Sequence, residues 1–327
     1  MNVAVLHSAD AVEPPEDPVL GQIESALRAG GHDTRRVSVT HDVKELVATL
    51  RLDRPDLVIN LAESFDGKSA MESNVAALLN LLGLHYTGSS PAGLMLAGDK
   101  SLTKKVLSFH GIQTPQFATL YRGAVDWSGD LTFPVIVKPP QEDASLGITS
   151  ASVVHEIKDL FDRIDALQSE YQAPVLVEQY IEGREFYVGV LGNANAAALP
   201  VIELDFTGFP ADRPRIASWE AKWGADGEGS GAEYAGTRSV FPEHLDPELE
   251  ARMPKIAVDA FDALRLRDYA RIDLRVSDAG EIYVIEVNPN CYLERESEFA
   301  RAAQRAGWEY DALVARIVDL ASARYAR

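Results

Sequence analysis

The first hundred residues alternate short apolar segments with amphipathic ones, and this alternation limits the possible folds more than any other feature of the chain. Residues 3–6 and 56–61 have the apolar character of buried strands. Residues 18–29 and 73–82 have helical spacing, and a glycine follows each of them. Strands that alternate with helices predict a mostly parallel sheet covered by helices. Because no GxGxxG motif follows the first strand, a dinucleotide-binding domain is disfavoured.

The rest of the chain predicts two further α/β modules. A cluster of Gly, Ser and Pro at residues 87–91 marks the first boundary. The length of 327 residues has room for three modules. We expect an N-terminal α/β substrate domain at 1–92, a central module at 93–183 and a C-terminal module at 184–327.

Charge and cysteine content exclude several classes of protein. With 31 Lys and Arg against 50 Asp and Glu, the net charge is −19, which disfavours nucleic acid and anionic membranes as partners. The N-terminus lacks a signal-peptide pattern and no apolar run is long enough to span a membrane, so we expect a cytoplasmic protein. The single cysteine, Cys291, excludes an internal disulfide, and the histidines lack zinc-ligand spacing.

Residues 269–290 carry the most informative pattern, two alternating polar and apolar segments around a Ser-Asp-Ala-Gly turn. Side chains alternate between the two faces of a strand, so one face of this hairpin should hold Arg271, Asp273, Glu286 and Asn288. A tight turn predicts Arg271 opposite Glu286, and Asp273 opposite Val284. Two carboxylates and an amide offer the oxygen ligands that suit Mg²⁺ or Mn²⁺. The alternative is a solvated polar face without a ligand.

A second group of polar residues adjoins buried strands upstream. Lys138 ends the apolar strand at 133–138, where an ammonium without an anion would be costly. The loop at 139–149 is rich in small residues whose backbone N–H groups can approach phosphate oxygens. The strand at 175–181 has a polar end whose backbone can read an adenine edge, and Glu185 is placed to accept ribose hydroxyls. Taken alone, a lysine at a strand end such as Lys138 more often packs its stem while its ammonium group reaches solvent.

Five segments, spread over nearly the whole chain, resemble the ATP-grasp superfamily and within it the D-alanine–D-alanine ligase family. They are LLGLHYTGSSPAGLMLAGDKSLTKKVLSFHGIQTP, FPVIVKPPQEDASLGITS, VLVEQYIEGREFYVGVLG, YARIDLRVSDAGEIYVIEVNPN and SEFARAAQRAGWEYDALV. The resemblance implies a mixture of α/β and α+β structure. The central and C-terminal modules would form an ATP-grasp fold, behind an N-terminal parallel-sheet (pre-ATP-grasp) domain.

The resemblance also implies which residues bind ATP and metal. The ATP contacts would be Lys100, Lys138 and Lys222 at the phosphates, Glu178, Gln179, Tyr180 and Ile181 at the adenine, and Glu185 at the ribose. The ligands of two Mg²⁺ ions, for which Mn²⁺ can substitute, would be Asp273, Glu286 and Asn288. Arg271 would stabilise the charged transition state.

The implied reaction has two steps. A substrate carboxylate attacks the γ-phosphorus of ATP to give an acyl phosphate and ADP, and an amine then displaces phosphate to form an amide. Gathering phosphates and a carboxylate in one place demands cations and accurate positioning. The glycine-rich stretch at 224–236 is expected to be a lid that keeps water from the acyl phosphate. The alternative is a disordered surface loop.

Four departures from the family pattern concern the substrates. The usual Gly-Ser-Ser after the loop lysine is Asp143-Ala144-Ser145 here, so the hydroxyl that helps to place the first substrate is missing unless Ser145 substitutes for it. Trp223 replaces an aromatic hydroxyl beside Lys222, and the Pro-Gly-Met of the oxyanion site becomes Cys291, Tyr292 and Leu293.

The fourth departure concerns the pocket for the second substrate. The Ser-Leu that meets the carboxylate of that substrate is Ser297-Glu298 here. A glutamate in this pocket disfavours D-alanine and favours a cation. In the N-terminal domain, three acids remain candidates for contact with a substrate: Glu13, Glu16 and Glu63.

The sequence therefore predicts an ATP-dependent carboxylate–amine ligase that joins amino-acid substrates other than D-alanine plus D-alanine. Its partners would be small-molecule carboxylates and amines, and neither nucleic acid nor membrane. Two alternatives stay open: an authentic D-alanine–D-alanine ligase, and an ATP-binding protein that has lost turnover and regulates a partner. The resemblance suggests a homodimer, although no interface can be read from the sequence.

Overall fold

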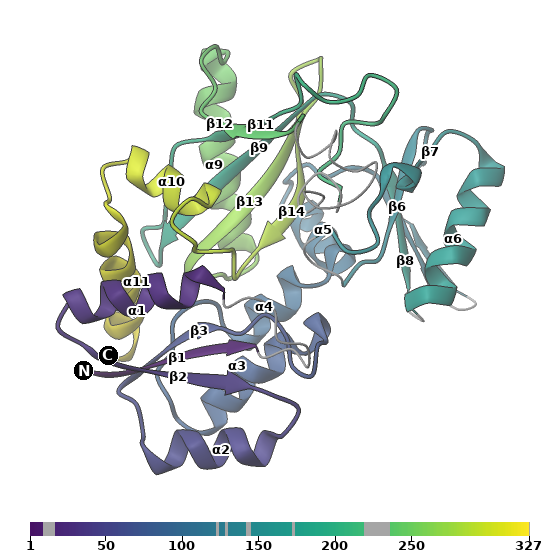
Figure 1. The fold of residues 1–327 in the computed structure, drawn as a ribbon. Coiled ribbons are helices and arrows are strands. Elements are labelled where there is room, and N and C mark those ends of the chain that lie inside the picture. Colours follow the sequence, from purple (N-terminus) through teal and green to yellow (C-terminus); the bar gives the residue numbers. More distant parts are fainter. Residues whose placement is uncertain are drawn as a thin grey trace.

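The computed structural model describes residues 1–8, 17–121, 124–127, 130–141, 145–171, 174–218 and 236–326, and the structural statements below concern these residues. They form three sheets, one parallel and two antiparallel (Figure 1). None of the described helices has the length and apolar character needed to cross a membrane. The domain boundaries after residues 92 and 183 stay predictions.

The first sheet is parallel, as the alternation of strands and helices predicts. Its order is β2–β1–β3, formed by β1 (Asn2–Ser8), β2 (Asp33–Val39) and β3 (Leu57–Leu61). The helices of this part are α1 (Pro18–Ala29), α2 (Val43–Leu52) and, after a 3-10 turn at Ser69–Met71, α3 (Glu72–Leu81). The Asp17 carboxylate caps α1 by accepting the N–H of Val19 at 3.0 Å, so the helix begins at the predicted residue.

The second sheet is antiparallel, with the order β5–β4–β8–β6–β7. Its strands are β4 (Phe117–Tyr121), β5 (Ala124–Trp127), β6 (Val135–Lys138), β7 (Val153–Val154) and β8 (Val175–Gln179). The chain enters it through α4 (Pro91–Ala97) and α5 (Lys100–Phe109). After a 3-10 turn at Ser150–Ser152, α6 (Ile157–Tyr171) covers one face (Figure 1). Apolar residues of α6, β6 and β8 form the core beneath this helix.

The third sheet is also antiparallel and has the order β12–β11–β9–β13–β14, with β10 paired to β9. Its strands are β9 (Arg184–Gly192), β10 (Ala197–Ala198), β11 (Ile202–Asp205), β12 (Arg238–Val240), β13 (Asp268–Val276) and β14 (Ile282–Asn288). Helix α9 (Pro247–Ala263) packs on one face, and α10 (Glu298–Arg305) on the other. Helix α5 contacts β14, so it lies between the second and third sheets.

The last helix, α11 (Tyr310–Tyr325), returns to the beginning of the chain and packs on α1 (Figure 1). One hydrophobic cluster therefore contains Val3 of β1, Ile59 of β3, Ile317 of α11 and Tyr269 of β13. The first and third sheets share this core, which fixes the parallel sheet relative to the strands of the candidate site.

Asp268 connects three distant parts of the chain from a completely buried position. Its carboxylate accepts hydrogen bonds from Arg324 of α11 at 2.7 and 3.0 Å, from the backbone N–H of Gly88 at 2.8 Å and from Asn193 at 3.0 Å. The residue itself has a positive φ of 65° at the start of β13. A buried carboxylate is tolerated only when it is paired and hydrogen-bonded, and here both conditions are met.

We predict that Asp268→Asn lowers the free energy of unfolding by about 3 kcal/mol or more, because it leaves the partly buried Arg324 without its counter-charge. Asparagine tolerates a positive φ, so backbone strain does not contribute to the expected loss of stability. Urea unfolding followed by circular dichroism measures the loss. Asp259→Asn, which breaks the surface pair with Lys255, is the control and should change stability by less than about 0.5 kcal/mol. Equal effects of the two substitutions would contradict the prediction.

Candidate functional site

The β13–β14 hairpin has a different register from the one predicted. Arg271 lies opposite Asn288, and Asp273 lies opposite Glu286. The predicted pairs, Arg271 with Glu286 and Asp273 with Val284, are wrong by two residues of β14. The turn is one residue longer than predicted, so that Val276 lies opposite Ile282, and a β-bulge between Asp273 and Leu274 leaves Ile285 as a second extra residue. Without the bulge, Glu286 and Asn288 would fall on the opposite face from Asp273. The shared face that the sequence predicts therefore exists, and the bulge is its cause.

Cations neutralise both carboxylates of this face. Arg271 donates two hydrogen bonds to Asp273, at 2.8 and 2.9 Å, and Lys100 of α5 pairs with Glu286 at 2.8 Å. The amide nitrogen of Asn288 donates to Asp273 at 3.1 Å, which directs the amide into the same cluster. The carboxylates of Asp273 and Glu286 already attract cations, and together with the amide oxygen of Asn288 they form a set of oxygen ligands that fits Mg²⁺. The described residues contain no cluster of three His, Cys, Asp or Glu side chains that could hold a metal ion.

The charge of Arg271 is permanent. Burial alone would lower the pKa of this guanidinium, but Asp273 and Glu298 raise it well above its usual value. The Glu298 carboxylate lies 3.6 Å from Arg271, and the Tyr187 ring lies beneath the guanidinium, 4.6 Å away. Arg271 is thus a permanent cation of the site, and Glu298 of α10 lies beside it.

Lys138 obtains its counter-charge from the protein itself. It forms an ion pair with Glu178 of β8, whose second carboxylate oxygen lies 2.7 Å from Lys104 of α5. Burial would raise the pKa of the Glu178 carboxyl, but the two lysines hold that pKa below its usual range. Burial also lowers the pKa of the Lys104 ammonium, although Glu178 opposes this shift. The anion that Lys138 requires is therefore a carboxylate on the neighbouring strand.

Glu185 is fixed by two neighbours on the third sheet. Arg275, which lies opposite it on β13, donates at 2.9 Å, and the Tyr187 hydroxyl donates at 3.0 Å. Arg275 also donates to the backbone carbonyl of Ile181 at 3.1 Å, so one guanidinium positions both of these predicted nucleotide contacts. Gly183, between them, has a φ of 141°, and a Cβ there would collide with the Val276 carbonyl. The turn that carries these contacts therefore requires glycine.

A pocket of about 70 Å³ lies between the second and third sheets and collects most of the described predicted residues. Those that line it are Lys138, Ser145, Glu178, Gln179, Tyr180, Ile181, Glu185, Asp273 and Glu286. Ile136, Ile148 and Ile216 belong to one apolar cluster and give the pocket a hydrophobic wall. The lining thus combines charged side chains with an apolar wall, the two kinds of contact that a ligand with a flat base and an anionic tail needs.

The predicted substrate residues occupy more scattered positions. The Ser145 hydroxyl donates to the Ala217 carbonyl at 2.6 Å, and the Ser297 hydroxyl donates to the Tyr292 carbonyl at 3.0 Å. Tyr292 itself donates to Asp17 at 2.7 Å, which ties the loop after β14 to the start of α1. The backbone N–H of Glu63 donates to the Ser8 hydroxyl at 3.1 Å, at the carboxyl end of the parallel sheet. Their contacts with substrates stay predictions.

Several predicted residues lie outside the described ranges. They are Glu13, Glu16, Asp143, Ala144, Lys222, Trp223 and the expected lid, except for Gly236.

Two residues of the site escaped the sequence analysis, although each carried a signal. Lys104 follows Lys100 by four residues in a predicted helix, a spacing that puts both side chains on one face. Arg275 follows Asp273 by two residues in a predicted strand, and so lies on the same face of β13.

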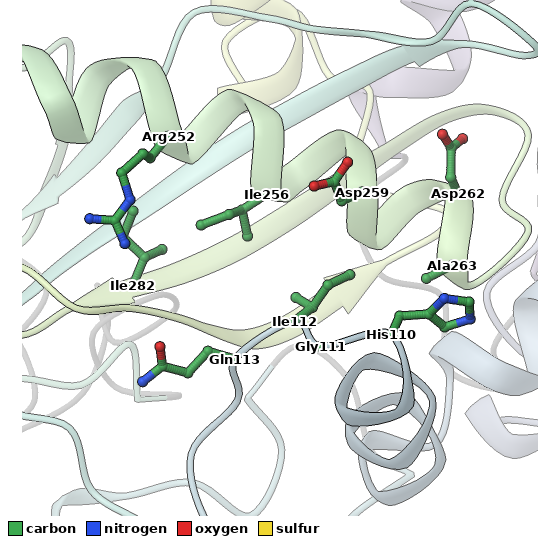
Figure 2. A pocket seen from close by; sticks show the side chains of 10 residues that line it. All are labelled: His110, Gly111, Ile112, Gln113, Arg252, Ile256, Asp259, Asp262, Ala263 and Ile282. Carbon is green, nitrogen blue, oxygen red and sulfur yellow. The ribbon is translucent and has the colours of Figure 1, made fainter.

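A second pocket, of about 550 Å³, lies between α9 and the segment that follows α5. Figure 2 shows Arg252 and Gln113 at one end of it and Asp262 and His110 at the other, with Ile256 and Ile112 between them. None of the residues that line it belongs to the predicted site.

Comparison with known proteins gives consistent matches over most of the chain. The family model described as "D-ala D-ala ligase C-terminus" matches residues 106–319. The uncharacterized protein y4sG of Sinorhizobium fredii is 34% identical over 95% of this chain and 89% of its own length. A D-alanine–D-alanine ligase of Saccharophagus degradans is 32% identical over 90% of this chain and 85% of its own length.

Two solved structures resemble the whole fold, each with a TM-score of 0.73 and 22% identity. One is the D-alanine–D-alanine ligase of Bacillus anthracis in complex with ATP, which aligns with 98% of this chain and 97% of that chain. The other is the VanG D-Ala:D-Ser ligase of Enterococcus faecalis, with 98% and 99% coverage. These likenesses confirm the fold class that the sequence motifs imply.

We predict that Cys291 is unreactive in the folded protein. It is buried, and burial raises the pKa of its thiol to about 12, so the reactive thiolate is scarce at pH 8. Ellman's reagent should react at least about a hundredfold more slowly with the native protein than with the same protein in guanidinium chloride. Fast reaction of one equivalent in the native protein would contradict this assignment.

Proposed function

The chain belongs to the D-alanine–D-alanine ligase family of ATP-dependent ligases, and we propose that it joins a carboxylate to an amine other than D-alanine through an acyl phosphate. The observation that carries this proposal is the convergence of cations and carboxylates around one pocket between two sheets. Lys138 and Glu178 face Asp273 and Glu286 there. We further propose a cytoplasmic location and a homodimer, both on the family resemblance.

In the first step, an oxygen of the substrate carboxylate forms a bond to the γ-phosphorus of ATP while the bond to ADP breaks. Lys100 and Lys138 supply positive charge for the phosphates, and Arg275 holds Glu185 and the Ile181 backbone in place for the nucleoside. Asp273, Glu286 and Asn288 are the residues that would hold two Mg²⁺ ions, which supply further positive charge at the transferred phosphoryl group. Most of the rate enhancement would come from this fixed charge.

In the second step, the amine nitrogen forms a bond to the acyl carbon, phosphate leaves with the electrons of its bond to that carbon, and the nitrogen releases its extra proton to solvent. The developing oxyanion needs a cation that does not titrate, and Arg271 meets this need because its pKa is raised well above the usual value. Tyr187 and Asp273 hold the guanidinium in a fixed orientation, so little reorganisation is required during the reaction.

The choice of second substrate depends on Glu298. This carboxylate lies beside Arg271, and its other oxygen accepts a hydrogen bond from Ser239 at 2.8 Å. A substrate carboxylate placed next to it would be repelled, and part of the charge of Arg271 is already compensated. We therefore favour an amine without a neighbouring carboxylate, or one with an additional cation, over D-alanine.

Replacement of one metal-site carboxylate tests the proposed reaction. Glu286→Gln should lower the release of phosphate from ATP, measured with a panel of amino acids and amines, by at least about a hundredfold. Asp278→Asn, in the exposed turn of the same hairpin, is the matched control and should keep full activity. Tight ATP binding by the wild-type protein without any single turnover would favour the alternative of a silent regulatory protein.

A second substitution tests the proposed acceptor. Glu298→Leu should raise the use of D-alanine as acceptor by about tenfold or more, because it removes the repelling carboxylate beside Arg271. Glu296→Leu, at an exposed position two residues earlier, should leave acceptor choice unchanged. If the wild-type protein already makes D-alanyl-D-alanine efficiently, identified by product mass, the authentic ligase is correct instead.

A further inference from the structure

Lys104 is a buried lysine without an assigned role. It is 1% exposed and lies one helical turn after Lys100 on α5. Its Nζ lies 2.7 Å from Glu178, but Lys104 does not line the pocket between the sheets, whereas Glu178 and Lys138 do. A side chain in this position acts on a ligand in the pocket only through its neighbours.

We infer that Lys104 is a positioning residue that keeps Lys138 available to ATP by sharing the negative charge of Glu178. The inference rests on the proposed ATP site. Each oxygen of the Glu178 carboxylate faces one ammonium group, Lys104 on Oε2 and Lys138 on Oε1. The three side chains together carry one positive charge, and Lys138 is the member at the pocket that can direct this charge to a phosphate.

The balance of charge explains why two lysines are required. A buried carboxylate paired with Lys138 alone would cancel its charge, and the pair would hold together strongly because water is excluded. A phosphate would then have to separate a buried ion pair before it gained a contact. With Lys104 on the other oxygen, Glu178 stays compensated when Lys138 turns to the phosphate.

The surroundings favour this division of roles. Lys138 and Glu178 come from neighbouring strands, β6 and β8, so the sheet fixes their separation. Lys104 reaches them from α5, whose N-terminus is capped by Asp99 through the N–H groups of Ser101 and Leu102 at 2.9 and 3.0 Å. Lys100 of the same helix is paired with Glu286, so one helix supplies a cation to each side of the pocket.

The test compares four proteins by isothermal titration with ATP in the presence of Mg²⁺. Wild type, Lys104→Met, Glu178→Gln and the double variant Lys104→Met/Glu178→Gln form a cycle in which the three side chains carry +1, zero, +2 and +1. We expect Lys104→Met to raise the Kd for ATP at least about tenfold in the wild-type background, but by less than about threefold in the Glu178→Gln background, where the altered adenine contact is common to both proteins. Lys104→Arg, which keeps the charge, should have a Kd within about threefold of wild type. Lys105→Met, which removes an exposed lysine paired with Asp126 from the same helix, should bind ATP normally.

Each other outcome overturns the inference. Wild-type affinity in Lys104→Met would show that the lysine does not act on ATP. An equal rise in Kd from Lys104→Met in the wild-type and Glu178→Gln backgrounds would show that packing, and not charge, is the cause. If Lys104→Met alone does not fold, a Kd at least about tenfold higher in the folded double variant than in Glu178→Gln has the same meaning. Failure of the wild-type protein to bind ATP would overturn both the proposed function and this inference. If the wild-type protein binds ATP, the outcomes above overturn the inference alone.

Discussion

A carboxylate removed from water must be matched by a cation, and this requirement organises much of the molecule. In the part of the chain that the structure describes, four carboxylate residues are less than 5% exposed, and each is paired: Glu178 with Lys104 and Lys138, Glu185 with Arg275, Asp268 with Arg324, and Asp273 with Arg271. Such pairs add little net stability, but the loss of one partner is costly. They therefore favour this arrangement of the elements, in which each of the four charges is matched. Three of the four surround the candidate site, and the fourth joins the parallel sheet to the third sheet and the last helix.

The sequence predicted the elements best where the hydrophobic pattern decides the structure. The parallel sheet, the helix at 18–29 and the polar face of the 269–290 hairpin follow from periodicity and capping, and all are present. Strand β2 was not predicted, because its sequence DTRRVSV holds three charged residues and buries only two side chains. The register of the hairpin could not be predicted, since it depends on the length of the turn and on a bulge at Ile285, and a two-residue period reveals neither.

Contacts between residues that lie far apart in the sequence were the other feature that could not be predicted. Lys138 was correctly identified as a lysine in need of an anion, but Glu178 lies forty residues away and its position depends on the pairing of β6 with β8. Likewise, Arg271 and Glu298 meet only because α10 packs against the third sheet. Sequence spacing predicts neighbours within one helix or one hairpin, such as Lys100 and Lys104. Contacts between elements depend on which strands pair and on how the helices pack against the sheets.

The shared core of the first and last segments has a consequence for synthesis of the protein. Strand β1 is made first, yet its Val3 and Val5 belong to the same cluster as Ile317 and Ala321 of α11. At roughly 5–20 residues per second, the ribosome needs about 15–60 s to reach α11 after β1 has emerged. During this interval α1 lacks the helix that packs on it, and the apolar side chains that α11 will cover are open to chaperones or to unwanted association. Completion of the N-terminal part thus waits for the last helix of the described chain.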